Sequence, residues 1–214
     1  MALKHIKFGA STWLWASPFT TETIEILFPK IAQFGFDVVE IAVEDPTLIN
    51  VKKVKEGLSK YGLDVTICGA FGSSRDLTNA SVEVQKNGLQ YIESCLDMCE
   101  ALGVSFFAGP MYSAVGKARM LSPEQRKAEW DLAVKNLRTV CEMAEARGLK
   151  IALEPLNRFE SDLVNTTDDA LRMVKDINHP AAKVMIDSFH MSIEERDVES
   201  AIKAAGDKLI HVQV

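Results

Sequence analysis

The feature that most constrains this chain is a regular alternation of short apolar runs with amphipathic helical stretches. The apolar runs are typical of strands, at 6–12, 37–42, 63–69, 105–109, 150–154, 183–187 and 208–214. The stretches with helical spacing lie between them, at 21–34, 51–61, 82–102, 123–147, 168–177 and 198–205, and most are followed directly by glycine. Repeated strand–helix units of this length predict a parallel sheet with right-handed crossovers.

Two architectures fit such a sheet, and the turn after the first strand discriminates between them. A doubly wound open sheet usually carries a glycine-rich phosphate-binding turn there, whereas residues 11–15 are aromatic (STWLW). An α/β fold of the (β/α)8 TIM-barrel type fits better, because polar residues cluster at the carboxyl ends of the strands. Such a barrel needs about 250 residues. We therefore expect 1–214 to be a single incomplete TIM-barrel domain, truncated after strand seven, with the seventh helix and eighth strand outside it.

Charge and hydropathy exclude several classes of partner. The chain has 24 Lys and Arg against 30 Asp and Glu, for a net charge of −6, and this balance argues against nucleic acid as a partner. No apolar run approaches the roughly 20 residues of a membrane span. The sequence shows no secretory leader pattern, and its four cysteines are not spaced as a metal ribbon. We expect a cytoplasmic protein with a small-molecule partner.

The strongest candidate site comes from the alternation of side chains along three successive strands. If the apolar residues of these strands face the helices, then Glu154, Asp187, and both His211 and Gln213 point into the barrel. Buried carboxylates need a compensating cation or a proton, and oxygen donors suit Mg²⁺ or Mn²⁺, with Co²⁺ tolerated. We predict Glu154, Asp187 and Gln213 as metal ligands, with His211 as the alternative to Gln213. Structural ion pairs with Lys or Arg are the competing interpretation.

Further polar and aromatic residues are placed to meet a ligand at the same end of the barrel. Glu160 and His190 lie in the predicted exit loops after strands five and six, where each could hydrogen-bond a polyhydroxyl ligand. Aromatic walls suit sugar rings, although they equally suit core packing. The remaining candidates for lining the pocket are Glu40, Cys68, Gly69, Trp13, Trp15 and Tyr112.

Three segments carry a family resemblance that covers the whole chain. Residues 154–160 (EPLNRFE), 185–191 (MIDSFHM) and 211–214 (HVQV) resemble the xylose-isomerase-like sugar phosphate isomerase/epimerase superfamily. Within it the chain is most similar to ketose 3-epimerases of the D-tagatose/D-psicose type, and residues 68–69 (CG) and 109–113 (GPMYS) add to the match.

The resemblance implies a metal held by residues on four strands. Glu154 and Asp187 match the first two ligands, and Gln213 takes the place of the second histidine of an H-x-H motif. A glutamine at that place is similar to the hydroxypyruvate isomerase branch. Glu160 and His190 match substrate-binding positions, and a last glutamate is expected on strand eight.

The implied activity is metal-dependent epimerisation of a free ketose at C3 through a cis-enediolate, in carbohydrate metabolism. Glu154 would be one catalytic group, the strand-eight glutamate the other, and Mn²⁺ the preferred cofactor. The resemblance also implies a homo-oligomer, either a dimer or a tetramer. The alternatives are a hydroxypyruvate isomerase or another aldose–ketose isomerase, a metal-dependent endonuclease on the same barrel, or an inactive barrel fragment.

Overall fold

The computed structural model describes residues 6–214, and seven parallel strands form one sheet in sequence order. Each strand pairs with the next one along the chain, so β1 and β7 are the two edges of the sheet within the described residues. The strands are β1 (Gly9–Ser11), β2 (Val38–Val43), β3 (Asp64–Gly69), β4 (Phe106–Gly109), β5 (Lys150–Leu153), β6 (Ala182–Asp187) and β7 (Leu209–Gln213).

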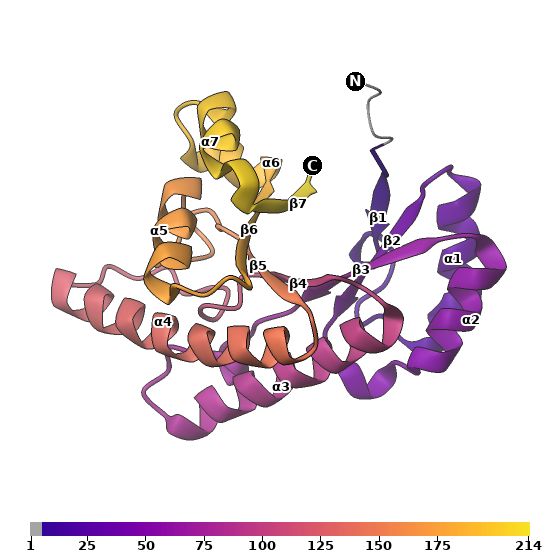
Figure 1. Cartoon of the computed structure of the whole chain (residues 1–214), viewed down its shortest axis with the longest axis horizontal. Coiled ribbons are helices and arrows are strands. Elements are labelled where there is room, and N and C mark those ends of the chain that lie inside the picture. Colours follow the sequence, from indigo (N-terminus) through magenta and orange to yellow (C-terminus); the bar gives the residue numbers. More distant parts are fainter. Residues whose placement is uncertain (1–5) are drawn as a thin grey trace.

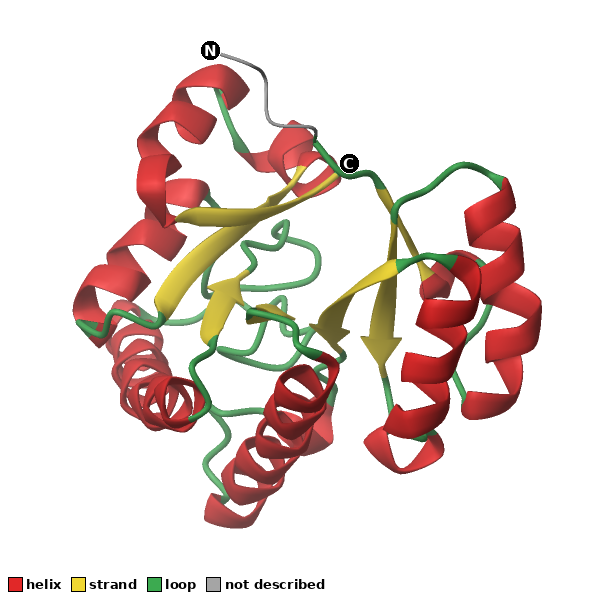
Figure 2. Cartoon of the chain, turned by 45° about the vertical axis from the view of Figure 1, so that its right-hand side comes forward, coloured by secondary structure: helices red, strands yellow, loops and turns green. Residues whose placement is uncertain are grey.

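Helices follow the strands on the outside of this sheet (Figure 1). They are α1 (Ile24–Gln33), α2 (Val51–Tyr61), α3 (Val82–Leu102), α4 (Pro123–Ala146), α5 (Thr167–Ile177), α6 (Ser188–Glu194) and α7 (Val198–Ala205). Figure 2 shows the strands curving around a common centre with the helices arranged outside them. This is the arrangement of a TIM barrel, and it confirms the predicted fold class. None of the helices in residues 6–214 has both the length and the apolar character needed to cross a bilayer.

Local sequence signals account for the ends of the longer helices. Ser122 begins α4 with a capping box, in which its hydroxyl accepts from the Gln125 N–H and the Gln125 side chain accepts from the Ser122 N–H. Pro123 occupies the first turn, where its missing N–H costs nothing. Gly62 ends α2 at a φ of 67°, a left-handed conformation that glycine adopts without a Cβ clash.

The two faces of the sheet pack differently, as the alternation of side chains predicts. Ile151, Leu153 and Val184 belong to the main core, which they share with the helices. Ala152 and Met185 belong instead to a small separate cluster with Ala108. Successive residues of a strand face opposite sides, so residues two apart face the same side. Glu154 comes two residues after Ala152, and Asp187 two after Met185. Both carboxylates therefore lie on the inner side of the sheet.

One predicted loop is wrong. Residues 188–190 were expected in an exit loop, but they form the start of α6. The Asp187 side chain caps this helix by accepting the Phe189 N–H at 2.6 Å. His190 therefore sits in the first turn of a helix, where its direction is set by the helix and by the end of β6.

Candidate active site

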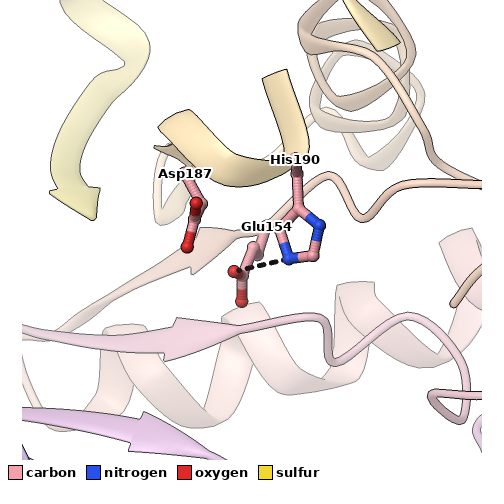
Figure 3. Close-up of side chains that lie close together, drawn as sticks. All are labelled: Glu154, Asp187 and His190. Atoms are coloured by element: carbon pink, nitrogen blue, oxygen red, sulfur yellow. Dashed lines mark ion pairs between the residues drawn. The ribbon is translucent and has the colours of Figure 1, made fainter. Parts of the chain in front are cut away.

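Three ionisable side chains meet at the carboxyl ends of β5 and β6 (Figure 3). Glu154 follows β5 directly, Asp187 ends β6, and His190 lies in α6. One nitrogen or carboxylate oxygen of each lies within 4.8 Å of those of the other two. The structure thus brings together the two carboxylates that strand alternation aims at one place.

No Lys or Arg of residues 6–214 forms an ion pair with Glu154 or Asp187. Glu154 is buried, and Nε2 of His190 lies 3.7 Å from its Oε1. Burial, together with the nearby charges of Asp187, Glu40 and Glu160, raises the pKa of Glu154 to about 8. The competing interpretation, structural pairing with Lys or Arg, finds no partner in this part of the chain. A donor set of this kind fits a hard divalent cation.

The tautomer of His190 follows from its contacts with Asn157. The backbone N–H of Asn157 lies 3.1 Å from Nδ1 of His190. A backbone N–H can only donate, so Nδ1 is the acceptor and the neutral ring carries its proton on Nε2. Nε2 is the nitrogen that faces Glu154. His190 therefore presents a donor to the site, which suits a ligand oxygen and not a metal ion.

The Asn157 side chain joins His190 to Glu160. Its Oδ1 accepts the Phe159 N–H at 2.9 Å, and its Nδ2 donates to Glu160 Oε1 at 2.9 Å. These two contacts define which end of the amide is nitrogen, and Nδ2 also lies 2.9 Å from Nδ1 of His190. Asn157 is a residue that the sequence reasoning missed. The sequence feature that could have indicated it is its position inside the 154–160 segment, three residues before Glu160.

The two predicted ligands on β7 contact Glu40 across the inside of the sheet. His211 Nε2 lies 2.7 Å from Glu40 Oε2, and Gln213 Nε2 donates to Glu40 Oε1 at 2.7 Å. In the register of β6 and β7, Gln213 is paired with Asp187. The structure places His211 against Glu40 and the Phe106 ring, outside the group formed by Glu154, Asp187 and His190.

A cavity of about 1730 Å³ lies over these residues. The Cys68 thiol lines its wall, and burial first, then Glu40 and Glu154, raise the pKa of that thiol, which keeps it protonated. Gly69 lies beside it, where an added Cβ would stand 2.5 Å from the Phe107 ring. Most of the predicted site residues line this cavity: Glu40, Cys68, Gly69, Glu154, Glu160, Asp187, His190, His211 and Gln213.

Two predicted lining residues lie elsewhere. The 3₁₀ turn Thr12–Leu14 carries Trp13 to the cavity wall, while Trp15 stacks on Phe34 at 6.4 Å. Tyr112 is fully buried and donates its hydroxyl to the Val164 carbonyl at 3.1 Å. Its hydroxyl is therefore used to join two loops.

Comparison with known proteins agrees with this geometry. A family model described as Xylose isomerase-like TIM barrel matches residues 28–214. L-ribulose 3-epimerase of Methylomonas sp. (strain DH-1) is 28% identical over 211 residues, covering 99% of this chain and 73% of the relative. D-psicose 3-epimerase of Ruminiclostridium cellulolyticum is 31% identical over 188 residues, covering 86% of this chain and 63% of the relative.

A solved structure extends the likeness to three dimensions. The D-allulose 3-epimerase of Methylomonas sp. in complex with D-allulose superposes with a TM-score of 0.88 at 28% identity. The match covers 98% of this chain and 72% of that one. The curated relatives and the structural neighbour are thus ketose 3-epimerases. The chain belongs to the xylose isomerase-like TIM barrel family.

Proposed function

We propose that this protein epimerises a free ketose at C3 with the help of a divalent cation, Mn²⁺ being preferred. The observation that carries the proposal is the adjacency of Glu154 and Asp187, two inward carboxylates without a Lys or Arg partner in residues 6–214. The ketose 3-epimerase activity of the relatives supports the same reaction.

The cation would be held by Glu154, Asp187 and the carbonyl end of Gln213. When bound there, it would polarise the C2 carbonyl of the ketose and lower the pKa of the proton on C3. Carboxylate and amide oxygens are the donors that Mn²⁺ and Mg²⁺ prefer.

Glu154 is proposed as the group that exchanges a proton with C3 on one face of the sugar. Loss of that proton leaves a cis-enediolate spanning C2 and C3, and return of a proton to the other face inverts the centre without any oxidant. The return requires a second acid–base group, which the family resemblance expects on an eighth strand. The N–H of His190 would donate to a hydroxyl or carbonyl oxygen of the sugar, and the carboxylate of Glu160 would accept a hydrogen bond from a hydroxyl group.

The test follows the proton as well as the product. The purified full-length protein, with the eighth strand that the family resemblance expects, is incubated with Mn²⁺ in D₂O with D-fructose, D-tagatose, L-ribulose and hydroxypyruvate, and the products are resolved by chromatography and NMR. The proposal predicts a C3 epimer carrying deuterium at C3. An aldose product carrying deuterium at C2 would assign an aldose–ketose isomerase instead. Metal binding without conversion of any ketose would refute the proposal.

A single substitution tests the role of Glu154. Glu154→Gln keeps the side-chain volume but removes the base, and we expect turnover to fall by at least about 10³-fold, of the order seen for lost acid–base groups. Glu142→Gln, on the outer part of α4, is the matched control and should keep its rate. Near-normal turnover in Glu154→Gln would remove Glu154 from the mechanism.

A further inference from the structure

Glu40 is the one carboxylate of the cavity wall that two side chains of β7 contact at once. It lies in β2 and is buried, with 7% of its surface exposed. Its two oxygens are used separately, Oε2 by His211 and Oε1 by Gln213, each at 2.7 Å. β2 pairs with β1 and β3, and β7 pairs with β6, so these contacts cross the interior of the sheet and are not neighbouring-strand contacts.

The contact between Gln213 and Glu40 determines which end of the Gln213 amide is free to bind another group. An ionised carboxylate oxygen only accepts hydrogen bonds, so the amide end at Glu40 is the NH₂ group. Turning the amide over would place its oxygen 2.7 Å from a carboxylate oxygen, where the two repel each other. The Gln213 carbonyl oxygen is therefore left free of Glu40.

Gln213 lies beside one of the proposed cation ligands in the sheet. Gln213 is the register partner of Asp187 on the adjacent parallel strand, so the two side chains leave the sheet side by side. The contact of Glu40 with His211 holds the carboxylate in place from its other oxygen. The orientation of Gln213 thus depends on a residue on a strand far from β7 in the sheet.

We propose that Glu40 is a positioning residue that orients the Gln213 amide, so that its carbonyl oxygen joins Glu154 and Asp187 as a donor to the divalent cation. This inference rests on the proposed function for the existence of the cation site. In this inference Glu40 acts by orienting Gln213, and it is not assigned a contact with the sugar. It also explains how a neutral amide serves where a wrongly turned NH₂ group would repel a cation.

Two substitutions of Glu40 separate orientation from charge. Glu40→Asp keeps the negative charge but is one methylene shorter and loses its reach to Gln213. Glu40→Gln keeps the length but loses the charge and one acceptor. We expect both to weaken Mn²⁺ binding, measured by isothermal titration calorimetry, by about tenfold to hundredfold, as for other partners that orient metal ligands. Unchanged affinity in Glu40→Asp would mean that Glu40 acts by its charge alone and would overturn the inference.

A double-mutant cycle tests whether the effect passes through Gln213. Gln213→Met removes both polar ends at similar volume, and in that background Glu40→Asp should change Mn²⁺ affinity by less than about threefold. Additive losses would overturn the inference. Glu160→Gln is the control. The charge of Glu160 is near enough to raise the pKa of Glu154, but Glu160 makes no hydrogen bond to Gln213. Its effect should add to that of Gln213→Met.

The readouts distinguish this inference from the proposed function. Mn²⁺ binding that depends on Glu40 through Gln213, without conversion of a ketose, would sustain the inference and refute the epimerase proposal. Wild-type protein that binds no Mn²⁺ would refute both. Circular dichroism and thermal melts of the metal-free variants show whether each is folded. If Glu40→Asp does not fold, Glu40→Gln enters the same cycle with Glu160→Gln as its charge-matched control.

Discussion

The backbone N–H of Asn157 donates to Nδ1 of His190 across 3.1 Å, and this contact determines which imidazole nitrogen faces the cavity. A main-chain N–H can only donate, so Nδ1 of the neutral ring is the acceptor and Nε2 carries the proton. His190 lies among the carboxylates but is arranged to donate a hydrogen bond.

Asn157→Asp should disturb this arrangement. The change replaces the Nδ2 donor with a second acceptor 2.9 Å from Nδ1 of His190 and from Glu160. We expect Nδ1 of His190 to lose this side-chain donor and keep only the main-chain one, visible in ¹⁵N chemical shifts of histidine-labelled protein, and kcat/KM to fall about tenfold to hundredfold. Asn165→Asp is the same chemical change in the same loop, where Asn165 contacts Leu156 and Ser161 carbonyls. An identical His190 spectrum in the two variants would contradict the prediction.

The metal-free protein should lose stability as the pH rises. The Glu154 pKa is about 8 in the folded protein against 4.5 in an ordinary carboxyl group, so the folded state holds this proton more tightly. The stability that this gives is complete below pH 4.5 and is lost as the pH rises through 8. Urea unfolding in EDTA at pH 5.5 and pH 8.5 should show a lower midpoint at the higher pH. Glu154→Gln should lessen that difference, and an equal difference in the variant would count against the assignment.

Cation binding should show the opposite pH dependence. A cation must displace the proton that Glu154 carries below pH 8. Apparent Mn²⁺ affinity should therefore rise by up to about tenfold per pH unit between pH 6 and pH 8 and level off above that. Calorimetry in buffers of different ionisation enthalpy would count the protons released. Binding without proton release at pH 6.5 would exclude a protonated Glu154.

Lys117 should be important for stability although it lies outside the cation site. Its ammonium group contacts Asp76 at 3.0 Å, Glu129 at 2.7 Å and Thr78 at 2.6 Å, and its side chain is 15% exposed. Lys117→Met leaves the buried Asp76 carboxylate without its cation, and we expect a loss of about 3 kcal/mol. Lys203→Met breaks an exposed pair with Glu199 and should leave the melting temperature nearly unchanged. Equal melting temperatures for both variants would contradict this account.

Sequence periodicity predicted the strand order, the helix ends and the inward direction of Glu154 and Asp187. These features depend on local alternation and on caps such as Ser122, which act within a few residues. The side-chain partner of Gln213 could not be predicted in this way. Its contact with Glu40 joins residues 173 positions apart and depends on the curvature that brings β2 opposite β7.

Local turn geometry explains the other differences. Trp13 and Trp15 look equivalent in the sequence, but the 3₁₀ turn between them directs one ring to the cavity and the other to Phe34. The helix that begins at residue 188 depends on the Asp187 side chain, which caps it by accepting a hydrogen bond. This use of Asp187 was not expected, because strand alternation predicted only that its carboxylate points into the barrel. Periodicity alone predicts neither the directions of the two tryptophan rings nor the start of this helix.

The loop after β4 holds the main chain of Glu160, a residue that lines the cavity. Gly116 donates its N–H to the Glu160 carbonyl at 2.8 Å, and the main chain of Lys117 pairs with that of Ser161 in an isolated parallel β-bridge. The main chain of Glu160 is thus held by a segment that belongs to another strand–helix unit. Insertions or deletions near residue 116 would move this carboxylate without replacing Glu154, Asp187 or His190, so the shape of the cavity can change through edits to a neighbouring strand–helix unit.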